Sequence, residues 1–312
     1  MAKLRGFGAY LPARVVDNTE IGAMCGADPA WIKQQTGIEQ RRWAASDERV
    51  ADLGVKAARD CLANCGALAA EVGLVLVASG SAERRFPGPA SSIAAALGLA
   101  GKPAIDLPVA SAGTLVGLAV AADLAARYRN VLVVGAEVMS RAIGLNPAYK
   151  DTGILFGDGA GACLVSAESG FAEIRDFILC SDGDFAEILR LDRDAPLFMD
   201  GRSVILQVSR KLPRTIQELL DRNNRKATEI EVFLLHQANL NLITKVAQVL
   251  GAPDARFFRN LGRYGNTSSA SLLIAAAEWW HGARGMRGPV VMAAFGAGLN
   301  WGAMLLDCGA NS

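Results

Sequence analysis

The sequence predicts an α/β protein in which helices pack on parallel or mixed sheets. Two observations support this prediction: short apolar runs rich in Val, Ile and Leu recur along the chain, and segments with helical character lie between them. The 312 residues, of which 51% are hydrophobic and 20% are charged, can bury a large core. Length alone favours one or two globular domains.

Individual elements can be assigned from these patterns. The composition of five apolar runs is typical of strands that are buried on both faces. They are "EVGLVLVASG" (71–80), "NVLVVGAEVM" (130–139), "ILFGDGAGACLVSA" (154–167), "EVFLLHQAN" (231–239) and "GPVVMAAFGAGLNWGAMLLD" (288–307). Four neighbouring segments are predicted to be helices: "SIAAALGLA" (92–100), "GTLVGLAVAADLAARY" (113–128), "VILQVSRKLPRTIQELLDRN" (204–223) and "LNLITKVAQVLG" (240–251).

The chain also shows a weak internal repeat. Residues 154–167 and 290–307 share the same order of strand, glycine-rich turn and strand. This similarity suggests a duplication of about 150 residues per half. We therefore predict an N-terminal half at 1–170 and a C-terminal half at 171–312. The polar segment 168–200 is predicted to be a connecting loop region.

Charge and composition limit the partners. Lys and Arg total 32 against 31 Asp and Glu, and no long basic run is present, so we expect no nucleic-acid partner. The first residues lack an apolar stretch of signal-peptide length, and we expect a cytoplasmic protein with no membrane association. The six cysteines lack metal-ligand spacing, which predicts reduced thiols packed mostly in the core and no metal site.

Only two histidines are available for catalysis. His281, in "EWWHGARG", follows a predicted helix and is interpreted as a surface or helix-terminal residue. His236 ends the apolar run "VFLL" and opens the polar turn "HQAN". Catalytic groups of α/β folds commonly lie at the carboxyl ends of strands, so His236 is a candidate. Asn266, in "GRYGNTSSAS", is either a local cap in a turn or part of the same site.

A lone hydroxyl stands at the start of a predicted buried helix. Ser111 lies in "PVASAGTLVGL" (108–118), where an apolar segment runs into the helix. Serine is a preferred helix N-cap, which is one interpretation. The other is an acyl-transfer nucleophile, because helix N–H groups and the helix dipole would stabilise an oxyanion there. The residues of this segment alone leave both open.

Three motifs together resemble a known family over nearly the full length. "FGDGAGA" (156–162), "HQAN" (236–239) and "YGNTSSAS" (264–271), in this order and spacing, are similar to the beta-ketoacyl-acyl carrier protein synthase III group of the thiolase superfamily. The resemblance implies the duplicated five-layer α/β/α/β/α thiolase fold and a homodimer, with the active site at the bottom of a tunnel for a coenzyme A arm. Supporting matches are "WIKQQTGI" (31–38), "FPGPAS" (86–91), "MDG" (199–201) and "AFGAGLNWG" (294–302).

The resemblance also implies roles for particular residues. The nucleophile falls at Ser111, the family's histidine at His236 and its asparagine at Asn266. The backbone N–H groups of Ser111 and Ala297 would form the oxyanion hole. The substrate would be an acyl-CoA, with no separate cofactor, and an acyl carrier protein is a candidate partner.

Four further positions are expected to bind substrate. Trp31 matches the residue that stacks on the adenine of coenzyme A, and Lys150 falls where an arginine usually covers the other face. Phe86 matches a residue that crosses the dimer interface to bound the acyl pocket. Asn239, the last residue of "HQAN", completes the set.

The nucleophile segment departs from the family pattern. In "DLPVASAGT" (106–114), Ser111 stands where the family has a cysteine. A serine hydroxyl has a far higher pKa than a thiol and needs a base within hydrogen-bond reach. His236 is the candidate base, with Asn266 near it.

Other departures concern the carrier protein. Asn241 replaces a basic residue after "HQAN", and the helix that follows carries only Lys245 where fatty-acid members show a basic cluster. Gln35 replaces the usual arginine of an "RTGI" motif. We therefore expect weaker docking of an acidic carrier protein and a specialised role, in polyketide or other secondary metabolism.

The sequence leaves four hypotheses open. The first is a Ser-His-Asn acyltransferase or starter-unit condensing enzyme that uses acyl-CoA. The second is an ordinary ketoacyl synthase III that carries an engineered Cys→Ser change at Ser111. The third is an inactive or decarboxylase-only subunit of a heterodimer. The fourth is a different chemistry on the same fold, because fold does not fix function.

Overall fold

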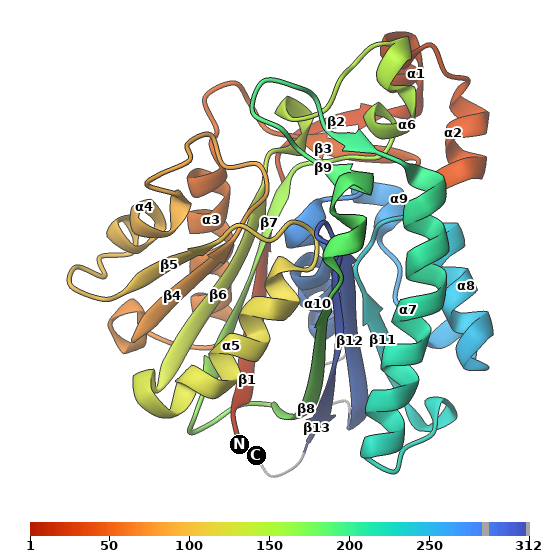
Figure 1. Ribbon diagram of the computed structural model, residues 1–312. Helices are drawn as coiled ribbons and strands as arrows, with labels where there is room; N and C mark the ends of the chain where they lie inside the picture. The colour runs from red at the N-terminus through yellow and green to blue at the C-terminus, as the bar shows by residue number, and fades with distance from the viewer. Residues whose placement is uncertain (283–286, 310–312) are drawn as a thin grey trace.

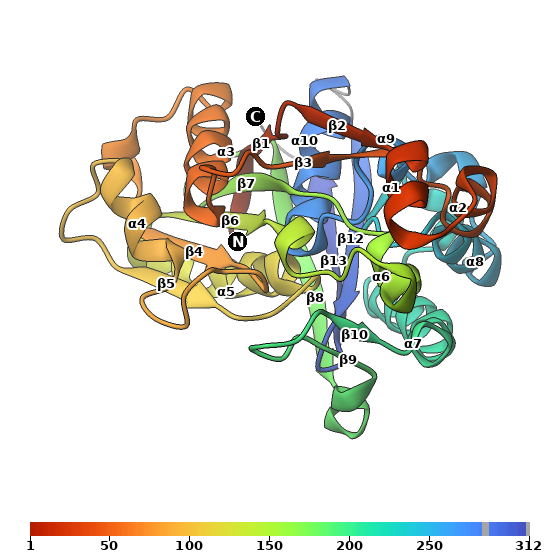
Figure 2. The same cartoon turned by 90° about the horizontal axis from the view of Figure 1, so that it is seen from above.

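A mixed β-sheet runs through the whole molecule. The computed structural model describes residues 1–282 and 287–309, and within them nine strands follow the order β11-β12-β13-β8-β1-β7-β6-β4-β5 (Figures 1 and 2). The strands are β1 (Lys3–Tyr10), β4 (Leu74–Ala78), β5 (Ala104–Leu107), β6 (Asn130–Glu137), β7 (Gly159–Ser166), β8 (Ala172–Ser181), β11 (Val232–Leu235), β12 (Gly288–Gly296) and β13 (Asn300–Cys308). The shorter pairs are β2 (Arg14–Asp17) with β3 (Gln40–Trp43), and β9 (Leu189–Arg190) with β10 (Phe198–Met199).

The sheet consists of two halves with a narrow junction. β1 pairs with β7 along most of its length, but with β8 only at Lys3↔Glu173 and Leu4↔Ala172. Parallel pairs (β4 with β5 and β6, β11 with β12) occur in both halves beside antiparallel ones, so the prediction of a mixed sheet is confirmed. The proposed boundary at residue 170 falls between β7 and β8 and stays a prediction.

Helices make up three layers around the sheet halves. α5 and α10 share one apolar core with strands of both halves and lie at the centre, while α3 and α4 cover one outer face and α7 and α8 the other (Figure 2). This is the predicted five-layer α/β/α/β/α arrangement. The helices are α1 (Asn18–Cys25), α2 (Pro29–Thr36), α3 (Val50–Asn64), α4 (Pro89–Ala96), α5 (Gly113–Tyr128), α6 (Lys150–Gly153), α7 (Gly201–Arg222), α8 (Leu240–Leu250), α9 (Leu261–Tyr264) and α10 (Ser271–Gly282).

Small residues allow the central helices to pack closely. A Cβ atom on Gly117 of α5 would lie 2.9 Å from Cγ1 of Val133 in β6. A Cβ atom on Gly135 would lie 2.3 Å from Cγ2 of Thr114 and 2.5 Å from the carbonyl oxygen of Ser269. Since such distances are below van der Waals contact, glycine is required for both helices to reach the sheet here. Their N-termini then lie beside each other.

Two element predictions need correction, and a third agrees with the structure. Residues 154–167 form a strand only from Gly159 onward, because the buried Asp158 instead accepts hydrogen bonds from the Ala44 and Ser140 N–H groups at 2.8 Å. The run 288–307 is a hairpin of two strands, which agrees with the predicted order of strand, glycine-rich turn and strand. Residues 168–200 are not simply a loop, since they contain β8, whose alternating sequence covers only one face of the sheet.

The expectations for the cysteines and for His281 agree with the described part of the chain. All six cysteines are free, and four of them (Cys25, Cys61, Cys163 and Cys308) are buried. His281 lies exposed near the end of α10, as predicted. Among the described residues, no helix is both long and apolar enough to cross a membrane.

Candidate active site

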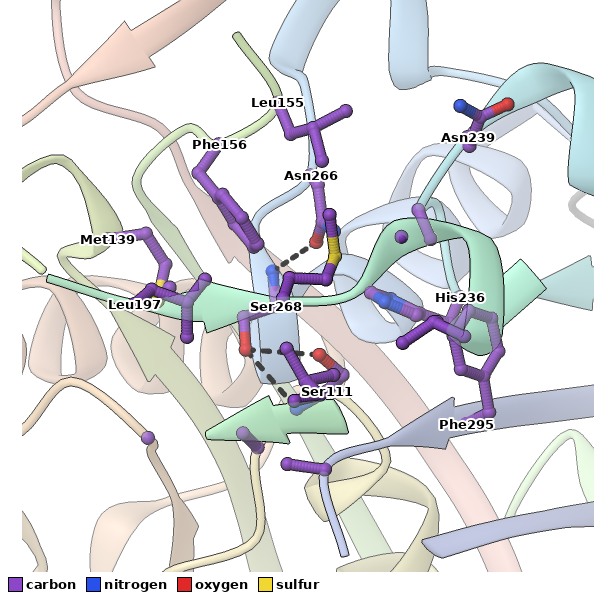
Figure 3. A pocket seen from close by; sticks show the side chains of 18 of the residues that line it. Ser111, Met139, Leu155, Phe156, Leu197, His236, Asn239, Asn266, Ser268 and Phe295 are labelled. Carbon is purple, nitrogen blue, oxygen red and sulfur yellow. Dashed lines mark hydrogen bonds between the residues drawn. The ribbon is translucent and has the colours of Figure 1, made fainter. Parts of the chain in front are cut away.

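Three segments that are distant in sequence line one buried cavity. Ser111 lies between β5 and α5, His236 directly follows β11, and Asn266 precedes α10 (Figure 3). The cavity holds about 110 Å³, and the three residues are 8%, 3% and 6% exposed. The structure thus brings together the three residues on which the sequence analysis relied.

Ser111 adopts a left-handed backbone conformation, with φ of 62°. The N-cap position of α5 is Ala112, and no side chain caps this helix, so the interpretation of Ser111 as a helix cap is wrong. β12 passes close by, since a Cβ atom on Gly296 would lie 1.9 Å from the Ala110 carbonyl oxygen. This close approach requires a glycine at position 296.

Two hydroxyl groups from the short turn just before α10 hold the backbone of Ser111. Its N–H donates to Oγ of Ser269 at 3.0 Å and to Oγ of Ser268 at 3.2 Å. The Ser111 hydroxyl lies 3.3 Å from the same Ser268 oxygen. The N–H that was predicted to form half of the oxyanion hole therefore already has two acceptors. Ala297, the other predicted donor, lines the cavity.

His236 is neutral because of its surroundings. Burial lowers the pKa of His236 from 6.5 to about 3. The ring packs edge-on against Phe295, with centroids 5.4 Å apart, and its Nδ1 contacts the hydroxyl of Ser271. Within the described residues, no hydrogen bond joins His236 to Ser111, the contact expected of a base and its nucleophile.

Asn266 is both a local cap and a residue that lines the cavity, the two roles that the sequence left open. Its side-chain Oδ1 accepts a hydrogen bond from the N–H of Ser268 at 2.9 Å, as a local cap does. Its backbone N–H donates to the Leu155 carbonyl at 2.9 Å, and its carbonyl accepts from the Gly157 N–H at 3.0 Å. Because Oδ1 is engaged, the amide NH2 group is what Asn266 can offer to a molecule in the cavity.

The remaining wall of the cavity is largely apolar. Side chains from several elements contribute to it, including the short β9/β10 hairpin and the starts of α7 and α8. Such a surface suits an acyl chain and offers few hydrogen bonds. Prominent members are Met139, Leu155, Leu197 and Phe295, which Figure 3 labels. Met199 and Leu242 also line the cavity.

The predicted substrate-binding residues occupy three different places. Lys150 Nζ lies 4.8 Å from the ring centre of Trp31, so these two residues face each other as expected. Asn239 lines the cavity, caps α8 and donates from Nδ2 to the Gln35 carbonyl at 3.0 Å. Phe86 is 85% exposed and does not line the cavity of its own chain.

Sequence reasoning missed four residues around the site. Ser268, Ser269 and Ser271 supply hydroxyls next to Ser111 and His236, and the density of hydroxyl residues in "YGNTSSAS" could have indicated this. The fully buried Glu137 accepts hydrogen bonds from the Ser269 N–H at 3.2 Å and from Ser81. The only signal for Glu137 in the sequence is that it is the one acidic residue in the apolar run "NVLVVGAEVM" (130–139).

Comparisons with known proteins identify the class. The family model described as 3-oxoacyl-[acyl-carrier-protein (ACP)] synthase III matches residues 105–183, and the model of its C-terminal part matches residues 220–308. The solved 3-oxoacyl-[acyl-carrier-protein] synthase III of Aquifex aeolicus VF5 is 32% identical, with a TM-score of 0.94, over 98% of this chain and 100% of that one. The fold and the site thus define an acyl-transferring condensing enzyme of the thiolase superfamily.

The family within this class is equally clear. The beta-ketoacyl-[acyl-carrier-protein] synthase III of Oleidesulfovibrio alaskensis is 37% identical over 96% of this chain and 97% of its own length. The chain belongs to the beta-ketoacyl-[acyl-carrier-protein] synthase III family. It is also similar to the priming beta-ketosynthase of the R1128 polyketide biosynthetic pathway, at 31% identity with a TM-score of 0.91 over 99% of this chain and 96% of that one.

Proposed function

We propose that Ser111 takes an acyl group from acyl-CoA and passes it to an acceptor. The acceptor is a malonyl unit on an acyl carrier protein or a small-molecule nucleophile, in polyketide or other specialised fatty-acyl metabolism. The observation that carries this proposal is the convergence of Ser111, His236 and Asn266 on one buried cavity with an apolar wall. The similarity to a polyketide priming ketosynthase favours the specialised setting.

The transfer consists of two steps. In the first, Ser111 Oγ bonds to the thioester carbonyl carbon, the carbon–sulfur bond breaks, and the hydroxyl proton ends on the sulfur of free coenzyme A. In the second, the acceptor attacks the ester carbonyl carbon, the bond from that carbon to Ser111 Oγ breaks, and Oγ takes the proton that the acceptor loses, or a proton from solvent when the acceptor is a malonyl unit. With a malonyl acceptor, carbon dioxide leaves and a carbon–carbon bond forms. No separate cofactor takes part in this scheme.

The oxyanion of each step needs donors within the cavity. We assign this role to the N–H groups of Ser111 and Ala297. The N-terminus of α5 adds the positive end of its dipole. For Ser111 to serve, its N–H must turn from the hydroxyls of Ser268 and Ser269 to the substrate. This change would replace the two hydrogen bonds to serine hydroxyls by a hydrogen bond to the substrate oxygen.

The coenzyme A arm is proposed to enter past Trp31 and Lys150. A planar adenine would lie between them, replacing the 4.8 Å cation–π contact of the free protein with stacking on both faces. Asn239, at the start of α8, would contact the arm nearer the reacting carbon.

A homodimer fits two exposed features of the first half. β5 is the edge strand of the sheet, and Ile105 in its centre is 45% exposed. An unpaired edge of this kind is suited to pairing with another strand. Phe86 is exposed on the loop before α4, where it would reach the acyl pocket of a second copy. Light scattering on the purified protein measures this state directly.

Docking of a carrier protein is proposed to be weak. Asn241 directs its side chain to the Gln35 carbonyl at 3.0 Å, which ties α8 to α2. Lys245 is then the only basic residue on α8. A short basic surface gives little electrostatic steering of an acidic partner.

Intact-mass measurement tests the proposal. The protein is incubated with short acyl-CoAs, and we expect one acyl adduct on the native chain and none on Ser111→Ala. Ser111→Cys should form the adduct faster, because a thiolate needs less help from a base. Absence of any adduct on the native chain rules out the nucleophile. If only the cysteine variant condenses with a malonyl thioester, the engineered or inactive interpretation is correct instead.

A further inference from the structure

A fully buried carboxyl group lies behind the wall of the cavity. Glu137 is the last residue of β6, has no exposed surface, and is not among the described residues that line the cavity. Its donors among the described residues are all neutral N–H and O–H groups. They come from the end of β4 (residues 79–81) and from the short turn just before α10 (Ser268–Ala270). Since a buried carboxyl group costs free energy unless its oxygens accept hydrogen bonds, these contacts hold Glu137 in place.

The two oxygens of Glu137 bind different segments of the chain. Oε2 accepts from the N–H of Ser81 at 2.9 Å and from the Ser81 hydroxyl at 2.6 Å. The N–H of Gly80 reaches Oε2 at 3.0 Å and Oε1 at 3.1 Å. Oε1 also accepts from the N–H of Ser269 at 3.2 Å. The segment after β4 therefore fixes the plane of the side chain, and Oε1 holds the turn before α10.

Ser269 transmits this constraint to Ser111. Ser269 is fully buried, its hydroxyl donates to the Val109 carbonyl at 3.0 Å, and its own carbonyl accepts from the Thr114 hydroxyl at 2.9 Å. A hydroxyl has one proton, which the Val109 carbonyl accepts here, so a lone pair of Ser269 Oγ faces the N–H of Ser111 at 3.0 Å. The position of Ser269 therefore determines where that N–H is held.

We infer that Glu137 is a positioning residue for the backbone N–H of Ser111 and that it acts through Ser269. Ser111 has a φ of 62°, and a non-glycine residue keeps this conformation only where its surroundings over-determine it. The chain of contacts from Glu137 through Ser269 is part of those surroundings. Its effect on acylation rests on the proposed function of Ser111, whereas its effect on the position of the N–H does not.

Glu137→Gln interrupts this chain with a side chain of nearly the same shape. Each native oxygen accepts from a backbone N–H, so the new NH2 group must face the N–H of Ser81 or that of Ser269. The contact with Ser269 is the longer one and has no hydroxyl beside it on Oε1. We therefore expect Ser269 to lose its acceptor and the N–H of Ser111 to be held less firmly.

Hydrogen exchange followed by NMR measures the N–H of Ser111 directly. In Glu137→Gln it should exchange about 5- to 10-fold faster, the factor that corresponds to the net contribution of one hydrogen bond. The N–H of Cys163, in the middle of β7, reports on global unfolding and should change less. Ser81→Ala, which removes one donor to Oε2, should act in the same direction with a smaller effect. Glu168→Gln, at an exposed ion pair with Arg129, is the matched control and should exchange like the native chain.

Adduct kinetics separate a positioning role from a merely structural one. Glu137→Gln should lower the maximal rate of acyl adduct formation about 3- to 10-fold. The half-saturating acyl-CoA concentration should stay unchanged, because neither Glu137 nor Ser269 is among the described residues that line the cavity. In a Ser269→Ala background, Glu137→Gln should have no further effect on the rate, since the two residues act in one chain.

The two measurements distinguish the inference from the proposed function. A Ser111 N–H that exchanges at the native rate in both Glu137→Gln and Ser81→Ala overturns the inference. Additive effects of Glu137→Gln and Ser269→Ala on the adduct rate overturn it as well, because Glu137 would then act by another route. A native chain that forms no adduct, while exchange at Ser111 responds as expected, refutes the proposed function alone.

Discussion

The two central helices begin in similar ways but play different parts. Each follows a serine in the left-handed region, with φ of 62° at Ser111 before α5 and 47° at Ser268 before α10. At the α10 entry, the oxygens of Asn266 and Glu137 accept the N–H groups of Ser268 and Ser269. At the α5 entry no side chain of the described residues caps the helix, and hydroxyls of the α10 entry accept from the N–H of Ser111, two residues before the helix begins.

This difference indicates which helix is the support. Holding a non-glycine residue in a left-handed conformation costs roughly 1–2 kcal/mol, and such strain persists only where the surroundings over-determine it. Glu137 of β6 and Asn266 accept hydrogen bonds from the α10 entry and fix it. The hydroxyls of that entry then hold the N–H of Ser111. The α5 entry supplies the reactive hydroxyl.

Asn266 gives the largest expected effect, because it belongs to both parts. Asn266→Asp keeps an oxygen for the Ser268 N–H but loses the amide donor, so stability should stay near the native value. The rate of carbon dioxide release from a malonyl thioester should fall about 10²–10³-fold, as on loss of one oxyanion donor. Asn266→Ala should lose both the rate and about 1 kcal/mol of unfolding free energy. An Asn266→Asp enzyme of native rate contradicts the assigned donor.

Two glycines test the entries by crowding them. Alanine at Gly296 places Cβ 1.9 Å from the Ala110 carbonyl, beside the α5 entry, and alanine at Gly135 places it 2.5 Å from the Ser269 carbonyl of the α10 entry. Both changes should lower the unfolding free energy by roughly 1–3 kcal/mol or more. Urea titration measures this, and Gly183→Ala, which meets nothing within 4 Å, is the matched control. A native-like Gly296→Ala protein refutes the tight approach.

The sequence predicts the buried helices and strands around the site better than it predicts which turns meet there. The α5 segment matches its predicted range, 113–128, because an alanine-rich run without Pro or interior charge clusters has few alternatives. β8 was missed because the polar composition of 168–200 suggested a loop, although its polar and apolar residues alternate as in a strand with one covered face. The local sequence made Ser111, His236 and Asn266 candidates, but their assignment to one site came from the resemblance to a family, since nothing local in "HQAN" or "YGNT" indicates that the two turns meet.

The hydroxyl contacts around Ser111 could not be predicted in this way. They depend on the packing of α5 against α10, which are separated by more than a hundred residues of chain. Burial of Glu137 likewise depends on Gly80 and Ser81 approaching it from another strand end. Single-residue patterns describe which face of an element is apolar, but they do not describe which polar atoms meet across elements.

A neutral His236 predicts a specific pH dependence of stability. Its pKa is about 3 in the folded chain against 6.5 unfolded, so between these values the unfolded chain binds a proton that the folded chain does not. The unfolding free energy should therefore fall as pH drops below 6.5, by up to about 1.4 kcal/mol per pH unit from this group. His236→Gln should lack that component, and parallel curves for the two proteins in urea titrations contradict it.

The smallest expected effect separates the two hydroxyls that hold Ser111. Ser269 also donates to the Val109 carbonyl at 3.0 Å and is fully buried, so Ser269→Ala leaves a carbonyl and an N–H with fewer partners and should cost about 1 kcal/mol of stability. Ser268→Ala removes the longer bond to the same N–H and, among the described residues, the only hydrogen-bond contact of the Ser111 hydroxyl. Its stability should change less than that of Ser269→Ala, while the rate of acyl adduct formation changes more. Equal effects of the two variants on both measurements would show that the hydroxyls act as one support and that neither is specific to the reactive oxygen.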